Sequence, residues 1–87
     1  MKIEKKVWPE YFKDIKSGKK KFELRLADFK VKPKDILILK EYDPKKKDYT
    51  GRQIKKKVSY VLKTKNLKFW SKKDIQKYGY QIIQINQ

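Results

Sequence analysis

The chain has 87 residues, and its 26 lysine and arginine residues outnumber its 10 aspartate and glutamate residues, so its net charge is +16 at neutral pH. A chain of this length has a modest core, which predicts a single domain over residues 1–87 and excludes a large cleft between domains. The sequence contains no cysteine and no histidine. This excludes disulfide bonds, the usual zinc sites and catalysis by Ser-His-Asp or Cys-His groups, and we expect no metal and no cofactor.

The apolar content is high enough for a folded protein. Hydrophobic residues make up 38% of the chain and aromatic residues 14%, which is unlike a disordered tail. No run approaches the roughly 18 apolar residues of a membrane span, and the first residues lack the apolar stretch of a signal peptide. We therefore expect a monomeric protein of the cytoplasm without a membrane partner.

The positive charge predicts a polyanionic partner. Each phosphate that a basic side chain neutralises releases condensed counterions, so this charge favours binding to RNA or another nucleic acid. Because all but two of the basic residues are lysine, a lysine-rich proteome is the alternative explanation. Adaptation to high temperature usually raises glutamate together with lysine, which has not happened here, and we favour a functional origin of the charge.

The first predicted elements are a strand and a helix. Charged and apolar residues alternate over residues 2–8, which predicts a short strand. A helix is predicted over residues 9–17, because Pro9 suits its first turn and Phe12 and Ile15 share one face. The glycine that follows supplies the left-handed residue at which many helices end.

A second strand is predicted over residues 19–26, where the apolar period changes to two. In this strand Glu23 and Arg25 share the face that is expected to point away from the core. Residues 28–35 then predict a loop, because Pro33 prevents regular pairing. The face of the strand that is expected to pack in the core carries Phe22, Leu24 and Leu26.

A long hairpin is predicted in the middle of the chain. The apolar run at residues 36–39 indicates a central strand covered on both faces, and this strand is expected to continue over residues 40–42. Asp43-Pro44 opens a polar tip that Thr50-Gly51 closes, and the return strand is predicted over residues 52–62. Lys56 interrupts the apolar face of the return strand, which indicates either a side chain that reaches the rim or a β-bulge.

The last predicted elements are a helix over residues 71–77 and a strand over residues 80–85. Ser71 is the expected N-cap of this helix, with Asp74 three residues later. The order of elements predicts an α+β fold in which a mostly antiparallel sheet is curved or closed and helices cover its ends.

One motif joins the first helix to the second strand, and it resembles a known signature. The residues Gly18-x-Lys20-x-x-Glu23-x-Arg25 resemble the G-x-K-x-x-E-x-R signature of the ASCH domain, the activating-signal-cointegrator homology module of the PUA-like superfamily. The similarity covers nearly the whole chain, which resembles a small prokaryotic branch of that family. It implies a PUA-like β-barrel of about five strands with two short helices, and binding of RNA or nucleotides in a cleft at the motif.

One position departs from the resembled family. Where its members often have Gly-Asp before the central strand, this chain has Lys34-Asp35. A lysine cannot adopt the conformations open to glycine without cost, so we expect this turn to be different or strained.

The resemblance also leaves catalysis open. Some ASCH proteins are amidohydrolases acting on acetylated cytidine and others are ribonucleases, and the amidohydrolases resemble this motif except for a Thr at the position of Glu23. A hydroxyl beside a lysine can be activated as a nucleophile, whereas a carboxylate there pairs or accepts hydrogen bonds. The enzyme hypothesis therefore has Lys20 and Glu23 as its acid-base pair, and a hydrolase of a modified nucleoside or of RNA as its activity.

The leading hypothesis is a nucleic-acid-binding cleft in which Lys20 and Arg25 contact phosphates or base edges and Glu23 orients them. An ordinary surface ion-pair cluster is the alternative for these three residues. A third hypothesis is a protein-interaction module that meets an acidic partner. Arg52 has two candidate roles, a phosphate contact or an ion pair with Asp43. The remaining candidate nucleic-acid-binding residues are Lys19, Lys21, Trp8 and Trp70, the two tryptophans as stacking surfaces at the rim.

Overall fold

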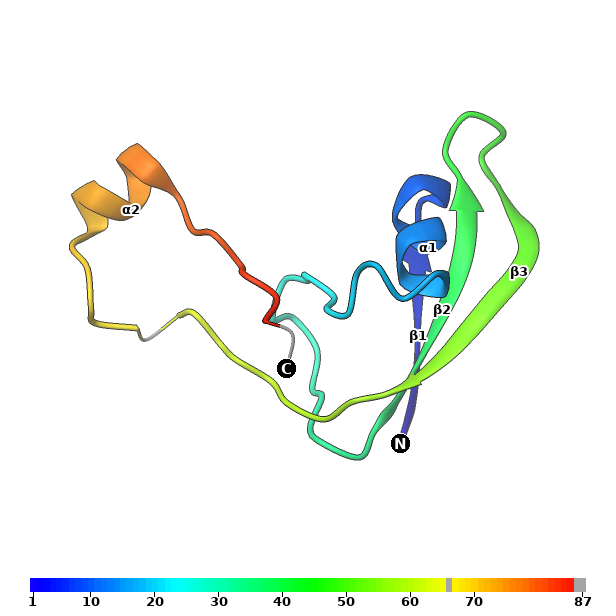
Figure 1. Cartoon of the computed structure of the whole chain (residues 1–87), viewed down its shortest axis with the longest axis horizontal. Helices are drawn as coiled ribbons and strands as arrows, with labels where there is room; N and C mark the ends of the chain where they lie inside the picture. The colour runs from blue at the N-terminus through cyan, green and yellow to red at the C-terminus, as the bar shows by residue number, and fades with distance from the viewer. Residues whose placement is uncertain (66, 86–87) are drawn as a thin grey trace.

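A computed structural model describes residues 1–65 and 67–85 of the expected single domain (Figure 1). Three strands form one open sheet in the order β1-β2-β3, with two short helices outside it. The predicted first strand, first helix, central strand and second helix are all present within one or two residues of their expected bounds. In chain order the elements are β1 (Lys2–Val7), α1 (Pro9–Lys16), β2 (Ile36–Asp43), β3 (Asp48–Lys57) and α2 (Lys72–Tyr78).

The sheet is mixed, although the sequence predicted a mostly antiparallel one. β1 runs parallel to β2, with Lys2 opposite Ile36 and Val7 opposite Glu41. β3 returns antiparallel to β2 after a turn at residues 44–47. A parallel pair needs a crossover connection, and the chain supplies it with α1 and the long loop that follows.

The core lies where α1 packs on β2. Pro9 occupies the first turn of α1, and the helix turns Phe12 and Ile15 toward the sheet, where both are buried. They meet Val7 of β1 and Leu39 of β2, with Leu37 and Ile54 packed at the margin. Gly18 follows the helix with a φ of +83°, as expected of the residue that ends it.

The return strand of the hairpin lies earlier in the chain than predicted. β3 begins at Asp48, before Thr50-Gly51, and ends at Lys57, so residues 58–62 do not belong to the return strand. The ladder between β2 and β3 is irregular between Lys40 and Tyr42, and Gly51 lies in β3 near this point with a φ of +94°. The bulge that the sequence suggested at Lys56 is therefore located elsewhere, and Lys56 pairs regularly with Leu37.

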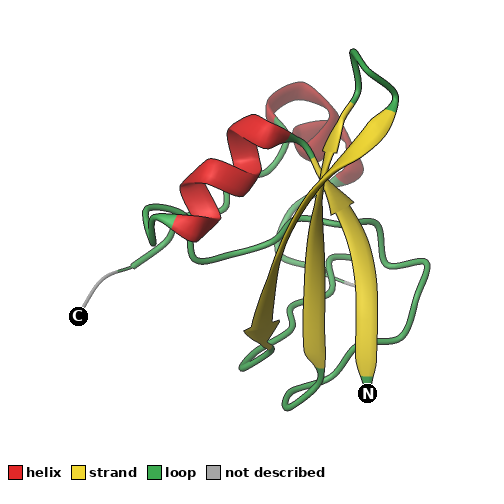
Figure 2. Ribbon diagram, turned by 90° about the vertical axis from the view of Figure 1, so that its right-hand side faces the viewer, coloured by secondary structure: helices red, strands yellow, loops and turns green. Residues whose placement is uncertain are grey.

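The closed five-stranded barrel expected from the resemblance is wrong. Figure 2 shows the three strands side by side as an open sheet. Residues 19–26 and 80–85, which were predicted as strands, are extended but belong to no ladder of the described chain. Here the side chain of Gln84 takes the place of a backbone partner, because it accepts from the N–H of Lys21 and donates to the carbonyl of Lys19.

The faces of residues 22–26 are also opposite to the prediction. Leu24 and Leu26 are 67% and 81% exposed, whereas the side chains of Glu23 and Arg25 are only 14% and 31% exposed. Arg25 donates to the backbone carbonyl of Lys6 at the edge of β1. Alternation alone does not say which face turns inward, and here a hydrogen bond at the sheet edge decides it.

The turn before β2 is strained, as the departure from Gly-Asp predicted. Lys34 has a φ of +81°, a conformation that costs about 1–2 kcal/mol for a residue with a Cβ. The turn is held on both sides, since the N–H of Lys34 donates to the carbonyl of Val58 (2.8 Å) and the N–H of Val58 donates to that of Asp35 (2.8 Å).

The segment after β3 lies apart from the core. α2 stands at the far end of the molecule from the sheet (Figure 1), and none of its residues is buried. Ser71 caps it as predicted, by accepting from the N–H of Asp74 (3.1 Å). Over the described residues, neither helix is long and apolar enough to cross a membrane.

Candidate functional site

A pocket of about 430 Å³ lies beside the sheet, between the segment that follows α1 and the segment that follows β3. Its floor is apolar and comes from Leu37 and Leu39 of β2 and from Ile15 of α1. The two extended segments form its walls, because they run past the sheet without joining it. The wall residues are Gly18, Lys20–Glu23, Arg25–Ala27, Phe29 and Val31 from the first segment, and Lys56–Lys63 from β3 and the second segment.

All four residues of the signature motif line this pocket. Glu23 and Arg25 form an ion pair, with Arg25 Nε 2.7 Å from Glu23 Oε2. Because Arg25 also donates to the carbonyl of Lys6, the pair is anchored to the edge of β1. Both side chains are partly exposed on the pocket wall, so a ligand can reach the pair without unfolding the chain.

Lys20 is held separately from this pair. Its Nζ lies 4.8 Å from the ring centre of Tyr11 and 5.2 Å from that of Phe22, which are cation–π distances. Its backbone N–H donates to the carbonyl of Asp14 in α1 (2.9 Å). Among the described residues, the ion pair of Glu23 is with Arg25 and not with Lys20.

The rim of the pocket is strongly basic. Six lysine and arginine residues line it against one acidic residue, Glu23. The sequence pointed to Lys20, Lys21 and Arg25 but missed the three contributed from β3 and beyond, which are Lys56, Lys57 and Lys63. A signal for them was present, because Lys56 interrupts the apolar face of its strand.

The other predicted residues lie outside the pocket lining. Lys19 is exposed at the end of α1, where its carbonyl meets Gln84. Trp8 is the half-exposed N-cap residue of α1. Trp70 lies before α2, in contact with Phe69 and Tyr80.

Arg52 makes an ion pair that the sequence did not predict. Its partner is Glu41 and not Asp43: Arg52 Nε lies 2.8 Å from Glu41 Oε1 and Arg52 Nη2 lies 2.9 Å from Oε2. Thr50 Oγ1 donates to the same Oε1 at 2.6 Å. The Glu41 side chain is only 1% exposed, whereas that of Arg52 is 61% exposed. The guanidinium of Arg52 is therefore bound to the buried carboxylate, while its outer side faces solvent. Its central carbon lies 5.6 Å from the ring centre of Phe12.

Two buried carboxylates have shifted pKa values, and both lie outside the pocket. Burial raises the pKa of Glu41, but the hydrogen bonds from Thr50 and Arg52 and the charge of Arg52 outweigh it and hold the pKa below its usual value. The backbone N–H of Lys32 lowers the pKa of Asp35 against the effect of burial, with further help from the Met1 amino group and the Lys32 ammonium. Both groups are structural, since their partners belong to the sheet and its adjoining turn.

The described residues offer no ready metal site. Residues 1–65 and 67–85 contain no group of three or more aspartate, glutamate, histidine or cysteine side chains placed to hold an ion. The lining of the pocket instead offers lysine and arginine donors, one carboxylate, the hydroxyls of Ser59 and Tyr60 and an apolar floor.

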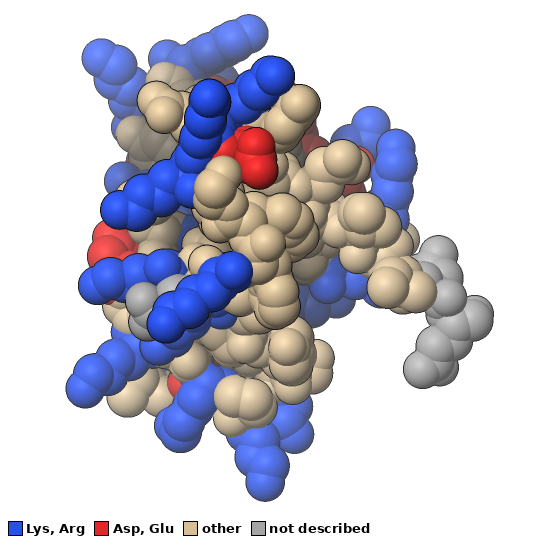
Figure 3. Space-filling view, turned by 90° about the vertical axis from the view of Figure 1, so that its left-hand side faces the viewer, with Lys and Arg blue, Asp and Glu red and all other residues tan. Residues whose placement is uncertain are grey.

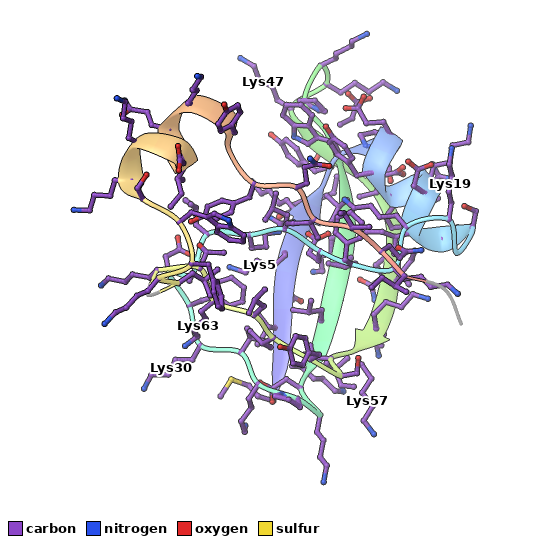
Figure 4. The ribbon with its side chains drawn as sticks, turned by 60° about the vertical axis from the view of Figure 1, so that its left-hand side comes forward. Lys5, Lys19, Lys30, Lys47, Lys57 and Lys63 are labelled. Atoms are coloured by element: carbon purple, nitrogen blue, oxygen red, sulfur yellow. The ribbon has the colours of Figure 1, made fainter. Side chains whose placement is uncertain are left out.

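Lysines are spread around the outside of the molecule, and one face also carries a broad uncharged area (Figure 3 and Figure 4). Figure 4 shows Lys30 and Lys63 on the side toward α2, Lys19 on the opposite side near α1, and Lys47 and Lys57 at the two ends of the sheet. Figure 3 faces the side on which α2 lies, and there a continuous uncharged area is bordered by lysine and arginine side chains. A ligand on this side meets uncharged surface in the middle and positive charge around it (Figure 3).

Residues 3–85 match a family described as a domain of unknown function, DUF3850. No curated protein and no solved structure matches the chain.

Proposed function

The chain belongs to the DUF3850 family, whose description assigns no activity, and we propose from its own residues that it is a nucleic-acid-binding module, with RNA as the expected ligand. The observation that carries the proposal is the pocket, which gathers the motif residues Lys20, Glu23 and Arg25 beneath a basic rim. The resemblance of the motif to the ASCH signature supports the same conclusion.

The composition of the pocket suits a nucleotide better than an inorganic anion. Phosphates are contacted by lysine and arginine, and the rim offers six such residues. An inorganic anion gains nothing from the apolar floor that Leu37 and Leu39 supply, whereas the face of a base does. Glu23 is the one carboxylate of the lining that can accept from a base amino group, and its position is set by Arg25.

The net charge extends the proposal beyond the pocket. A charge of +16 attracts the backbone of a nucleic acid over much of the surface, and it opposes association between two copies of the chain. We therefore take the monomer as the binding unit and keep the prediction of a cytoplasmic protein.

The test compares two substitutions that remove one positive charge each. Arg25→Ala removes a pocket residue, and Lys46→Ala removes a residue from the hairpin tip, which is outside the pocket lining. With a fluorescently labelled single-stranded RNA, we expect Arg25→Ala to raise the Kd about tenfold, as for a loss of about 1.4 kcal/mol. Lys46→Ala should raise it only about twofold, through the general loss of charge.

Thermal unfolding of both variants is measured alongside, because Arg25 also contacts the edge of β1. Equal effects of the two substitutions, with both variants folded, would show that the charge acts without the pocket. Incubation with acetylated cytidine and with labelled RNA tests the enzyme alternative, in which Glu23→Gln abolishes turnover.

A further inference from the structure

Three aromatic side chains, two before α2 and one after it, form an exposed cluster, which we call the aromatic cluster. The ring centres of Phe69 and Trp70 are 5.5 Å apart with an angle of 63° between the rings. Those of Trp70 and Tyr80 are 6.4 Å apart with an angle of 66°. The rings therefore meet edge to face, and Trp70 is their common member.

The aromatic cluster is exposed although its side chains are large and largely apolar. Phe69 is 75% exposed, Trp70 56% and Tyr80 45%. The chain as a whole exposes 8178 Å², whereas a compact protein of its mass of 10.6 kDa exposes about 5,500 Å². Contiguous exposed apolar surface of this kind marks an interaction site.

The surroundings of the aromatic cluster are basic. Between residues 67 and 85 the only acidic residue is Asp74, whose N–H is bound to the cap of α2. The same stretch holds four lysines, and the Nζ of one of them, Lys77, lies 5.2 Å from the ring centre of Tyr78. The four are Lys68, Lys72, Lys73 and Lys77. An occupant of the cluster must therefore accept both aromatic contact and positive charge.

We propose that the aromatic cluster is a stacking platform for the bases of single-stranded nucleic acid, a second binding surface separate from the motif pocket. This inference rests on the proposed function and adds that the ligand is single-stranded. Aromatic side chains in a positively charged surface bind single strands because every base presents a face for stacking and every linkage carries a charge. In a duplex these faces are covered by neighbouring base pairs, so the platform selects unpaired strands.

The connecting segment makes the two surfaces parts of one path. Residues 56–63 line the motif pocket, and the chain continues from them to Phe69 and Trp70. Lys63, at the pocket rim, lies on the side of the molecule toward α2 (Figure 4). If a strand places one nucleotide in the motif pocket, Lys63 can contact its backbone on the side toward the aromatic cluster (Figure 4).

A second copy of the chain is a poorer occupant. Each copy carries +16, and the lysines that border the uncharged face in Figure 3 would be brought together by self-association. An acidic protein would satisfy the lysines, but flat stacking on edge-to-face rings is a property of bases. The charge and the geometry together favour the single strand.

The test uses the fact that the protein has only two tryptophans. Trp8→Phe leaves Trp70 as the sole tryptophan, and Trp70→Phe leaves Trp8. Each variant is titrated with an unlabelled oligouridylate of about 12 nucleotides, within the usual 4–16 nucleotides of such surfaces. We expect saturable quenching of Trp70 fluorescence, at the Kd that anisotropy of a labelled strand gives for the same variant, and a much smaller change for Trp8. A duplex of the same length should leave Trp70 unquenched.

Two further substitutions separate stacking from apolar contact. Trp70→Phe keeps an aromatic face and should retain the affinity within about twofold, whereas Trp70→Leu keeps an apolar side chain without that face and should raise the Kd about fivefold or more. Circular dichroism checks that both variants fold; none of the buried core residues lies in this segment, so both should.

The outcomes distinguish the platform from the proposed function. If the strand binds with the salt dependence of a nucleic-acid complex but Trp70 is not quenched and Trp70→Leu binds normally, the platform is refuted and the proposed function stands. If no strand binds, the proposed function fails and the platform fails with it. If Trp70 fluorescence changes with protein concentration alone, a second copy covers the cluster and the platform is refuted.

Discussion

The part of the chain up to Lys57 and the part after it differ in how many of their side chains are buried. Residues 1–57 contain the sheet, α1 and every buried hydrophobic residue of the described chain. In the described residues from 58 to 85 no side chain is buried, and aromatic and lysine side chains lie at the surface. The first part holds the buried core, and the second carries the proposed aromatic platform, so we expect stability and binding to respond to substitutions in different parts of the chain.

The largest effect that sharpens this comparison is expected at Phe12. Its side chain is fully buried between α1 and the sheet. Phe12→Ala should lower the free energy of unfolding by about 3–5 kcal/mol, because it removes apolar contacts and leaves a cavity. Phe69→Ala is the matched control, since it removes the same group from an exposed position, and it should change stability by less than about 0.5 kcal/mol. Comparable losses in urea unfolding would mean that the two parts are not distinct.

The next effect is expected at the ion pair that crosses the hairpin. Arg52→Ala leaves the buried carboxylate of Glu41 without its guanidinium. We expect a loss of about 2–3 kcal/mol, less than the roughly 3–5 kcal/mol of a fully buried pair, because Arg52 itself is largely exposed. Lys55→Ala, which removes an exposed charge from the same strand, should be nearly neutral. Urea unfolding of the two variants measures the difference, and equal midpoints would contradict the structural role of the pair.

Acid should destabilise residues 1–57 by protonating the buried carboxylates of Asp35 and Glu41. The folded-state pKa values of Asp35 and Glu41 are lowered from their usual 3.8 and 4.5. The unfolded chain therefore binds more protons in this range, so stability is fully present above about pH 4.5 and is lost as the pH falls through the folded values. Thermal unfolding measured from neutral pH down to below the usual pKa values of the two carboxyls checks this direction. A melting temperature that rises on acidification would contradict it, and Glu41→Gln should flatten the profile.

The smallest effect is expected at the strained turn. Lys34→Gly should raise stability by about 0.5–1 kcal/mol, because glycine adopts the φ of +81° without steric cost but has more freedom to lose on folding. Lys34→Ala is the control, because it removes the same charge and keeps the strain. If Ala stabilises as much as Gly, the charge and not the backbone is responsible.

Local signals were sufficient for the elements that depend on neighbouring residues. Pro9 and Gly18 define the limits of α1, Ser71 defines the start of α2, and the apolar run from Ile36 defines β2. Each signal acts within one turn or one strand. The sequence therefore predicted these elements without any knowledge of the rest of the fold.

Long-range pairing was where sequence reasoning failed. The alternation at residues 19–26 and 80–85 is typical of strands, but it does not identify a partner, and the side chain of Gln84 satisfies the backbone of Lys19 and Lys21 instead. The parallel pairing of β1 with β2 and the Glu41–Arg52 pair likewise depend on contacts between distant residues. The candidate site was half predicted, because the motif residues are close in sequence while the lysines from β3 are not.

The most direct test of the account is the salt dependence of binding to single-stranded RNA. If the basic residues of the pocket rim engage phosphates, the logarithm of the association constant should fall with the logarithm of the salt concentration, at a slope of about −0.7 for each phosphate neutralised. Anisotropy of a labelled strand, measured over a range of salt concentrations, gives this slope. Binding at that slope supports the proposed function, and absent binding or a slope near zero would contradict it.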